Sequence, residues 1–152
     1  MSPSGIARYI NGYLQAMPPV AAMDLRFGGY EDGVLTLEAP LATHVNDKGC
    51  AFGGSLVSMM TLAGWGVVML RLQEAGIAAD VFVADSEVKY LAPLFDDLVA
   101  DARVADDADW DGFVSRLRER GRASLPLLAG VRLPAGGVAA ECRSRYVAVA
   151  KG

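Results

Sequence analysis

The sequence predicts an α+β fold in which a curved antiparallel sheet wraps around one long apolar helix. The 22 residues from Gly49 to Leu70 carry no charge, so a helix in this segment needs protein around it on nearly every side. The segments around it read as ordinary strands and turns of a soluble domain. Of the 152 residues, 53% are hydrophobic and 21% charged, which excludes a disordered chain. We expect one domain over residues 1–152.

The first segment, from Ser2 to Met17, predicts an amphipathic helix. Its apolar residues recur at helical spacing, at Ile6, Tyr9, Ile10, Tyr13, Leu14 and Met17. The serine that opens the segment is a suitable N-cap, and Pro18-Pro19 ends the helix. A hairpin is expected next, with arms at Leu25 to Tyr30 and Val34 to Ala39 around the turn Glu31-Asp32-Gly33.

A polar loop from Leu41 to Cys50 leads into the long helix. We place this helix at about Phe52 to Ala75, with Gly76 as its C-terminal stop. Its length alone would suit a membrane span, but its glycines and hydroxyl residues favour a helix in the core of a soluble fold. No membrane association is therefore expected. The first residues lack the pattern of an export signal, so we expect a cytoplasmic protein.

The remaining elements are two strands, a short extra helix and a second hairpin. They are expected at Val81 to Leu91, Leu98 to Ala105, Asp109 to Arg120, and Ala123 to Leu133 with Val138 to Val149. Strict alternation along the first of these strands puts Phe82 and Ser86 on one face and Asp85 on the other.

Composition excludes several classes of function. The net charge of −4 argues against a general nucleic-acid binder. Two cysteines and a single histidine lack the spacing of a zinc site, so no metal is expected. No phosphate-binding loop or dinucleotide motif occurs, and no cofactor is expected.

One run of residues resembles a known family. The run from His44 to Ser55, HVNDKGCAFGGS, and the segment from Ala84 to Pro93, with the order of elements, are similar to the hotdog-fold acyl-thioester enzymes. The closest resemblance is to the putative-thioesterase subgroup, found alone or fused behind an acetyltransferase domain, whose members include malonyl-acyl-carrier-protein decarboxylases. The resemblance implies a hotdog fold, a thioester of acyl carrier protein or coenzyme A as substrate, and a homodimer or dimer of dimers.

The family's chemistry needs donors for a thioester oxygen that becomes an oxyanion or enolate. Gly53 and Gly54 fall at the start of the long helix, where free N–H groups and the helix dipole favour negative charge. Asn46 lies just upstream and is a candidate side-chain donor to the same oxygen. The alternative is structural: the glycines allow close packing, and Asn46 makes a turn.

The absence of a carboxylate separates two reactions. Hydrolysis needs a base to activate water, yet no Asp or Glu lies between Phe52 and Gln73, and Thr61 stands about two turns into the helix. Decarboxylation needs no such base. Of the activities that the resemblance implies, the missing base favours a malonyl-acyl-carrier-protein decarboxylase, whose product would serve the initiation of fatty-acid synthesis. The alternatives are a thioesterase that uses Asp47 as its base, and a non-catalytic module that binds acyl carriers.

Other residues are weaker candidates. Ser86 is expected in or near the pocket, and Asp85 is expected to act across a dimer interface if it acts at all. Ser55 either contacts substrate or caps the helix, and capping is the favoured interpretation. Phe52 and Met59 are candidates for contact with the acyl group.

His44, the only histidine, lacks the motif that would accompany a catalytic triad. The arginines between Arg116 and Arg145 suit either phosphate groups and an acidic carrier or a solvated surface.

Overall fold

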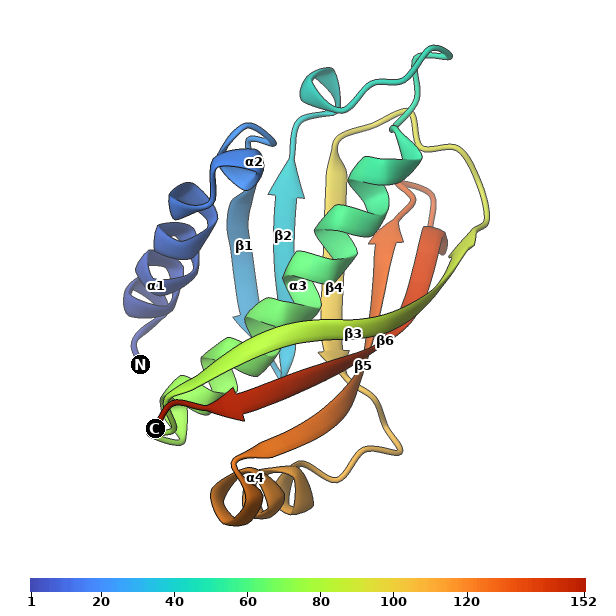
Figure 1. Ribbon diagram of the computed structural model, residues 1–152. Coiled ribbons are helices and arrows are strands. Elements are labelled where there is room, and N and C mark those ends of the chain that lie inside the picture. Colours follow the sequence, from blue (N-terminus) through green and yellow to red (C-terminus); the bar gives the residue numbers. More distant parts are fainter.

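The computed structural model describes residues 1–152 and contains a single six-stranded antiparallel sheet. The strands are β1 (Arg26–Glu31), β2 (Val34–Ala39), β3 (Ala79–Tyr90), β4 (Leu98–Val104), β5 (Arg122–Arg132) and β6 (Val138–Ala150). The helices are α1 (Pro3–Ala16), α2 (Pro18–Ala21), α3 (Gly53–Glu74) and α4 (Trp110–Arg120), with a 3₁₀ turn η1 (Leu41–Thr43). The strand order is β1-β2-β4-β5-β6-β3, and the sheet bends around α3 (Figure 1). The expected hotdog fold is confirmed.

The local signals at the ends of the elements are confirmed. The Ser2 hydroxyl accepts a hydrogen bond from the Gly5 N–H at the start of α1. The carboxylate of Asp109 caps α4 in the same way, and Gly121 ends that helix in the left-handed conformation. In the β1–β2 hairpin, Asp32 and Gly33 both have positive φ, as a tight two-residue turn requires.

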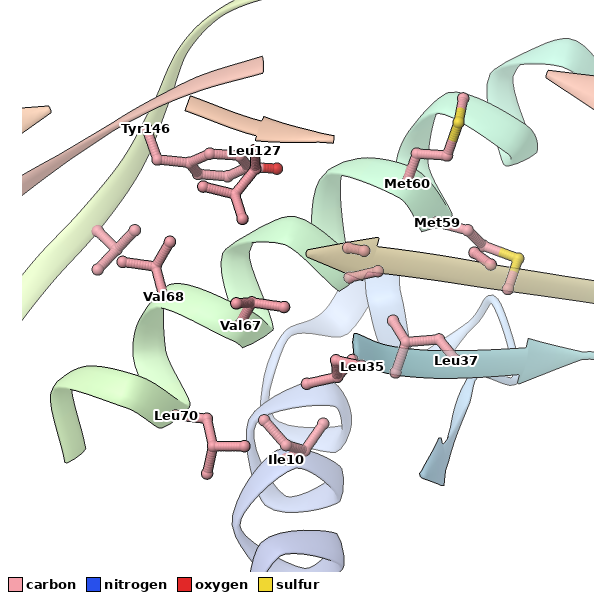
Figure 2. Close-up of a cluster of buried hydrophobic side chains, with 14 of the residues drawn as sticks. Ile10, Leu35, Leu37, Met59, Met60, Val67, Val68, Leu70, Leu127 and Tyr146 are labelled. Carbon is pink, nitrogen blue, oxygen red and sulfur yellow. The ribbon is translucent and has the colours of Figure 1, made fainter. Parts of the chain in front are cut away.

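Helix α3 forms the centre of the core. No residue from Gly53 to Leu72 is exposed. Figure 2 shows Met59, Val67 and Leu70 of α3 directed toward side chains of the sheet and of α1. The helix is long and apolar enough to cross a membrane by length and composition alone, but most of its apolar window is buried within the protein. It is the core helix that the sequence predicts.

One position along α3 has room only for glycine. Tyr146 of β6 is 1% exposed, and its hydroxyl donates a hydrogen bond to the Thr61 carbonyl at 2.7 Å. A Cβ on Gly64 would lie 2.5 Å from the Tyr146 hydroxyl oxygen. This glycine therefore allows β6 to pack directly on the helix.

A β-bulge changes the faces of β3. The register of β3 against β6 shifts between Val83 and Asp85, so Ala84 is the extra residue. Before the bulge, Val83 lies opposite the buried Tyr146; after it, Ser86 lies opposite the buried Ser144. The prediction that Phe82 shares the face of Ser86 is wrong, because the bulge reverses the alternation between them.

Strand β3 is the last strand of the sheet, so its outer edge has no strand beside it. Apolar side chains are nevertheless exposed along it, with Phe82 58% and Tyr90 59% accessible. The strand ends beside the amino end of α3, where the Tyr90 hydroxyl lies 3.5 Å from the Gly53 carbonyl oxygen. This junction positions the candidate site.

Candidate active site at the amino end of helix α3

The first turn of α3 presents two N–H groups without a protein acceptor. Phe52 is the N-cap and its side chain makes no capping hydrogen bond. The N–H groups of Ser55 and Leu56 donate to the Phe52 carbonyl at 3.0 and 3.2 Å, whereas those of Gly53 and Gly54 have no partner. No acidic residue lies in this turn. Together with the helix dipole, the two donors make this end of α3 suited to an oxyanion.

A cavity of about 310 Å³ lies against Gly53. It is lined by Ala51, Gly53, Leu56, Tyr90, Leu91, Ala92, Pro93 and Leu94. No carboxylate or imidazole is among these residues. Its volume is near the lower end for small-molecule sites, which suits a short acyl group.

The wall of this cavity opposite α3 comes from the end of β3 and the loop that follows. The Tyr90 ring would lie 3.4 Å from a Cβ placed on Gly53, so the glycine lets the ring and the helix backbone come close together. Sequence reasoning did not identify Tyr90 or Leu94 as site residues. The available signal was the position of Tyr90-Leu91-Ala92-Pro93 at the end of a strand within the segment that resembles the family.

A larger hollow of about 520 Å³ lies over β3, β4, β5 and β6 on the outer face of the sheet. It contains no residue of α3, and its rim is charged. Three of its side chains are already in ion pairs, Arg143 with Asp107, Asp101 with Arg132 and Arg103 with Asp106. Nothing in it resembles an oxyanion site.

Asn46 organises the loop that leads into α3. Its side-chain oxygen accepts hydrogen bonds from the N–H groups of Lys48 at 2.8 Å and Cys50 at 3.1 Å. Its amide nitrogen lies 3.3 Å from the Cys50 sulfur. The Asn46 side chain therefore stabilises a turn, which is the structural role that the sequence left open beside a role toward substrate. It does not line the 310 Å³ cavity. Since an amide nitrogen has two N–H groups, a donor remains, and the predicted role toward substrate stays a prediction.

His44 joins three segments around this loop. The ring Nε2 lies 2.6 Å from the Met23 carbonyl oxygen, and Nδ1 lies 2.7 Å from the Ser55 hydroxyl. A carbonyl can only accept, so Nε2 carries the proton, and in the neutral ring the Ser55 hydroxyl donates to Nδ1. The His44 carbonyl also accepts from the Phe52 N–H at 2.7 Å. Both side chains are at least 90% buried.

This network corrects one prediction about Ser55. It does not cap α3, because its hydroxyl is bonded to His44, 11 residues earlier in the chain. It does not line the cavity either. The arrangement is no Ser-His-Asp triad, because the partner of Nε2 is the Met23 carbonyl rather than a carboxylate.

The remaining polar candidates lie apart from the cavity. Asp47 is 80% exposed and pairs with Lys48 at 3.0 Å. Asp85 pairs with Arg145 at 2.7 Å on the outer face of the sheet. The Ser86 hydroxyl is on the inner face, 2.7 Å from that of Ser144. None of these side chains lines the cavity.

The two apolar candidates differ. Phe52 is 56% exposed, and a Cβ on Gly54 would meet its ring, so the ring lies beside the free N–H groups. Met59 is fully buried in the core and does not line the cavity.

Burial controls the protonation of the groups on β6 near the helix. It raises the pKa of the Cys142 thiol, which the hydrogen bond with Ser144 offsets only in part. Burial also raises the pKa of Tyr146. Both groups are therefore neutral near pH 7, and Cys142 is not a nucleophile. No group of three His, Cys, Asp or Glu side chains lies close enough together to hold a metal ion.

The fold is shared with solved structures of other proteins. A Chlorobaculum tepidum protein of unknown function is 26% identical over 99% of this chain and 98% of its own, with a TM-score of 0.91. A thioesterase of Shewanella oneidensis, itself described as putative, is 27% identical over 96% of this chain and 99% of its own, with a TM-score of 0.85. A Pseudomonas aeruginosa protein described as a probable thioesterase shares the fold at 21% identity, over 99% and 97% of the two chains, with a TM-score of 0.79.

The match at the level of sequence families covers nearly the whole chain. The model of the family described as putative thioesterase, YiiD C-terminal, matches residues 8–150. The matched region includes the loop of Asn46, the whole of α3 and all six strands. The chain belongs to this YiiD C-terminal family of putative thioesterases.

Proposed function

We propose that the protein acts on acyl thioesters at the amino end of α3, and that its reaction is the decarboxylation of a malonyl group carried on acyl carrier protein. The observation that carries the proposal is the pair of free N–H groups of Gly53 and Gly54, the first of which belongs to a residue that lines a cavity without a carboxylate. The family and its relatives support the substrate class. The residues that line the cavity favour the choice of reaction.

In this reaction the thioester oxygen would accept hydrogen bonds from the Gly53 and Gly54 N–H groups. The bond between the malonyl carboxylate and the α-carbon breaks, carbon dioxide leaves, and the electron pair forms an enolate whose oxygen carries the charge. The two N–H groups and the helix dipole stabilise that charge. The α-carbon then takes a proton from water, which gives the acetyl thioester and leaves hydroxide. A carboxylate in the cavity would repel the substrate.

Hydrolysis is the second candidate, since the family and its solved relatives are described as thioesterases. It would use the same oxyanion site, and water would need a base. Asp47 is the carboxylate of the loop that leads into α3, but it is exposed and paired with Lys48. For this reason we favour decarboxylation.

The test is to incubate the protein with malonyl and saturated acyl thioesters and to weigh the products by mass spectrometry, while free thiol is measured in parallel. Carbon dioxide and acetyl thioester in equal amounts, without free thiol, are expected. Free thiol without carbon dioxide would identify a thioesterase. Binding of the acyl carrier without turnover of any thioester would identify a non-catalytic module.

The outer edge of β3 supports a homodimer. An unprotected edge strand pairs readily with another strand, and Phe82, Val83 and Tyr90 expose apolar surface along this one. We propose that two copies pair their β3 strands antiparallel about a two-fold axis. Sedimentation velocity at micromolar concentration would give a mass of two chains, or of four if two dimers join, whereas a monomer would contradict the proposal.

A further inference from the structure

Four neighbouring arginines are without a carboxylate partner. Five of the seven other arginines form ion pairs, at Arg26, Arg103, Arg132, Arg143 and Arg145; Arg8 and Arg71 do not. Arg116, Arg118 and Arg120 of α4 and Arg122 of β5 are exposed and form none within 4.0 Å. We call these four residues the α4 arginine patch. Glu119 is also exposed among them, so residues 116–122 carry a net charge of +3 on a protein of net charge −4.

The patch and the acyl site lie at opposite ends of β3. Arg122 pairs with Val149 of β6, which pairs with Asp80 near the start of β3. The acyl site lies at the other end of that strand, at Tyr90. Ten residues separate these points, about 33 Å along an extended strand. Figure 1 shows the same separation, with α4 at the bottom and the first turn of α3 at the top.

The proposed dimer removes this separation. When two β3 strands pair antiparallel along their length, the start of one strand lies beside the end of the other. The partner's β6 and β5 follow at one strand spacing each. The backbone of Arg122 in one subunit then lies about 14 Å, or three strand spacings, from the end of β3 in the other subunit, and α4 with the other three arginines immediately precedes Arg122 in the chain.

We propose that the α4 arginine patch of one subunit binds the acidic surface of an acyl carrier protein whose acyl group enters the site of the other subunit. The inference rests on the proposed function. Guanidinium groups form strong paired hydrogen bonds with carboxylates and attract an acidic partner over a distance. A carrier protein presents its acyl group on a long phosphopantetheine arm, so its docking surface lies beside the cavity rather than in it.

Charge reversal tests the docking surface. Arg118→Glu and Arg122→Glu should each lower kcat/KM for malonyl-acyl carrier protein at least tenfold relative to kcat/KM for a small malonyl thioester of N-acetylcysteamine. The matched control is Arg8→Glu, because Arg8 is exposed on α1, forms no ion pair and changes the net charge equally. The effect should weaken at high salt. An equal loss of kcat/KM in the Arg8→Glu control would overturn the proposal. So would a loss with malonyl-CoA equal to that with malonyl-acyl carrier protein, because the patch would then bind phosphate rather than the carrier protein.

Mixed dimers test the use of the partner's arginines. Gly53→Phe fills the cavity, so one chain carries this change and the other carries Arg118→Glu with Arg122→Glu. That dimer retains one site with an intact cavity and an intact patch across the interface, and about half of the wild-type rate with the carrier substrate is expected. A dimer of a wild-type chain and a chain with all three changes should be nearly inactive.

The reverse order of rates in the two mixed dimers, or equal rates, would overturn the inference. The Gly53→Phe homodimer distinguishes a failure of this inference from a failure of the proposed function. If that homodimer still turned over the small thioester, the site at α3 would itself be wrong.

Discussion

The Ser55 hydroxyl donates a hydrogen bond to Nδ1 of His44 at 2.7 Å, between two buried side chains. Nε2 of His44 donates a hydrogen bond to the Met23 carbonyl, and the His44 carbonyl accepts one from the N–H of Phe52. The first turn of α3 is thus fixed to the loops on both sides of it. This fixes the direction of the Gly53 and Gly54 N–H groups before any substrate binds, as an oxyanion site requires.

Ser55→Ala should lower the free energy of unfolding by about 1–3 kcal/mol, because it leaves Nδ1 of His44 buried without a donor. In a chain that already carries His44→Ala, the same change should cost less, by about 0.5 kcal/mol or more. Urea denaturation of the four proteins of this cycle measures both values. Strictly additive losses would show that the two side chains are not coupled.

Asn46→Asp keeps the turn and removes the N–H donor, but it also adds a carboxylate near the site, so its decisive outcome is the one that excludes the donor role. An aspartate retains the oxygen that accepts from the N–H groups of Lys48 and Cys50 but has no N–H to offer a substrate. If Asn46 is a donor to the enolate, the rate should fall about 100-fold or more, while the melting temperature stays near that of the wild type. Asn46→Ala should lower both the rate and the melting temperature. A fall of less than threefold in a folded Asn46→Asp protein would remove Asn46 from the mechanism.

Asp47→Asn should leave turnover of the malonyl thioester within about twofold, because the side chain is 80% exposed and absent from the cavity. Surface ion pairs such as that with Lys48 also contribute little to stability, about 0–1 kcal/mol. Steady-state kinetics with the malonyl and saturated acyl substrates provide the measurement. A hundredfold loss of thiol release would make Asp47 the base of a thioesterase instead.

Gly64→Ala should destabilise the protein by about 1–3 kcal/mol, since the new methyl group would overlap the buried Tyr146 hydroxyl. The control is Gly12→Ala in α1, where a Cβ meets nothing within 4 Å. That change should stabilise by about 0.5–1 kcal/mol through helix propensity. Thermal and chemical denaturation compare the two variants, and losses of equal size would contradict the close packing of β6 on α3.

The helices and hairpins could be predicted because their signals are local. The spacing of apolar residues in α1, the cap at Ser2 and the turn at Asp32-Gly33 each depend on a few neighbouring residues. The uncharged run predicted a central helix covered by the sheet for an equally direct reason: such a helix is not stable in water unless it is covered.

The features that sequence reasoning missed depend on distant contacts. Ser55 has the position of a helix cap, and only the folded chain brings His44 to its hydroxyl. The bulge at Ala84 depends on how β3 meets β6, so alternation along β3 alone placed Phe82 on the wrong face. Tyr90 belongs to the cavity because β3 ends against Gly53, a relationship between two elements that neither segment shows by itself.

The covering of α3 has a consequence for biosynthesis. Of the strands with extensive contacts to this helix, β2 precedes it in the chain, while β3, β4, β5 and β6 follow. A ribosome therefore releases the most apolar segment of the protein well before the strands that enclose it, and β6 is completed only at residue 150. Until then the nascent chain exposes an aggregation-prone apolar surface. The yield of folded protein in cells should therefore depend on chaperones that shield such surfaces during translation.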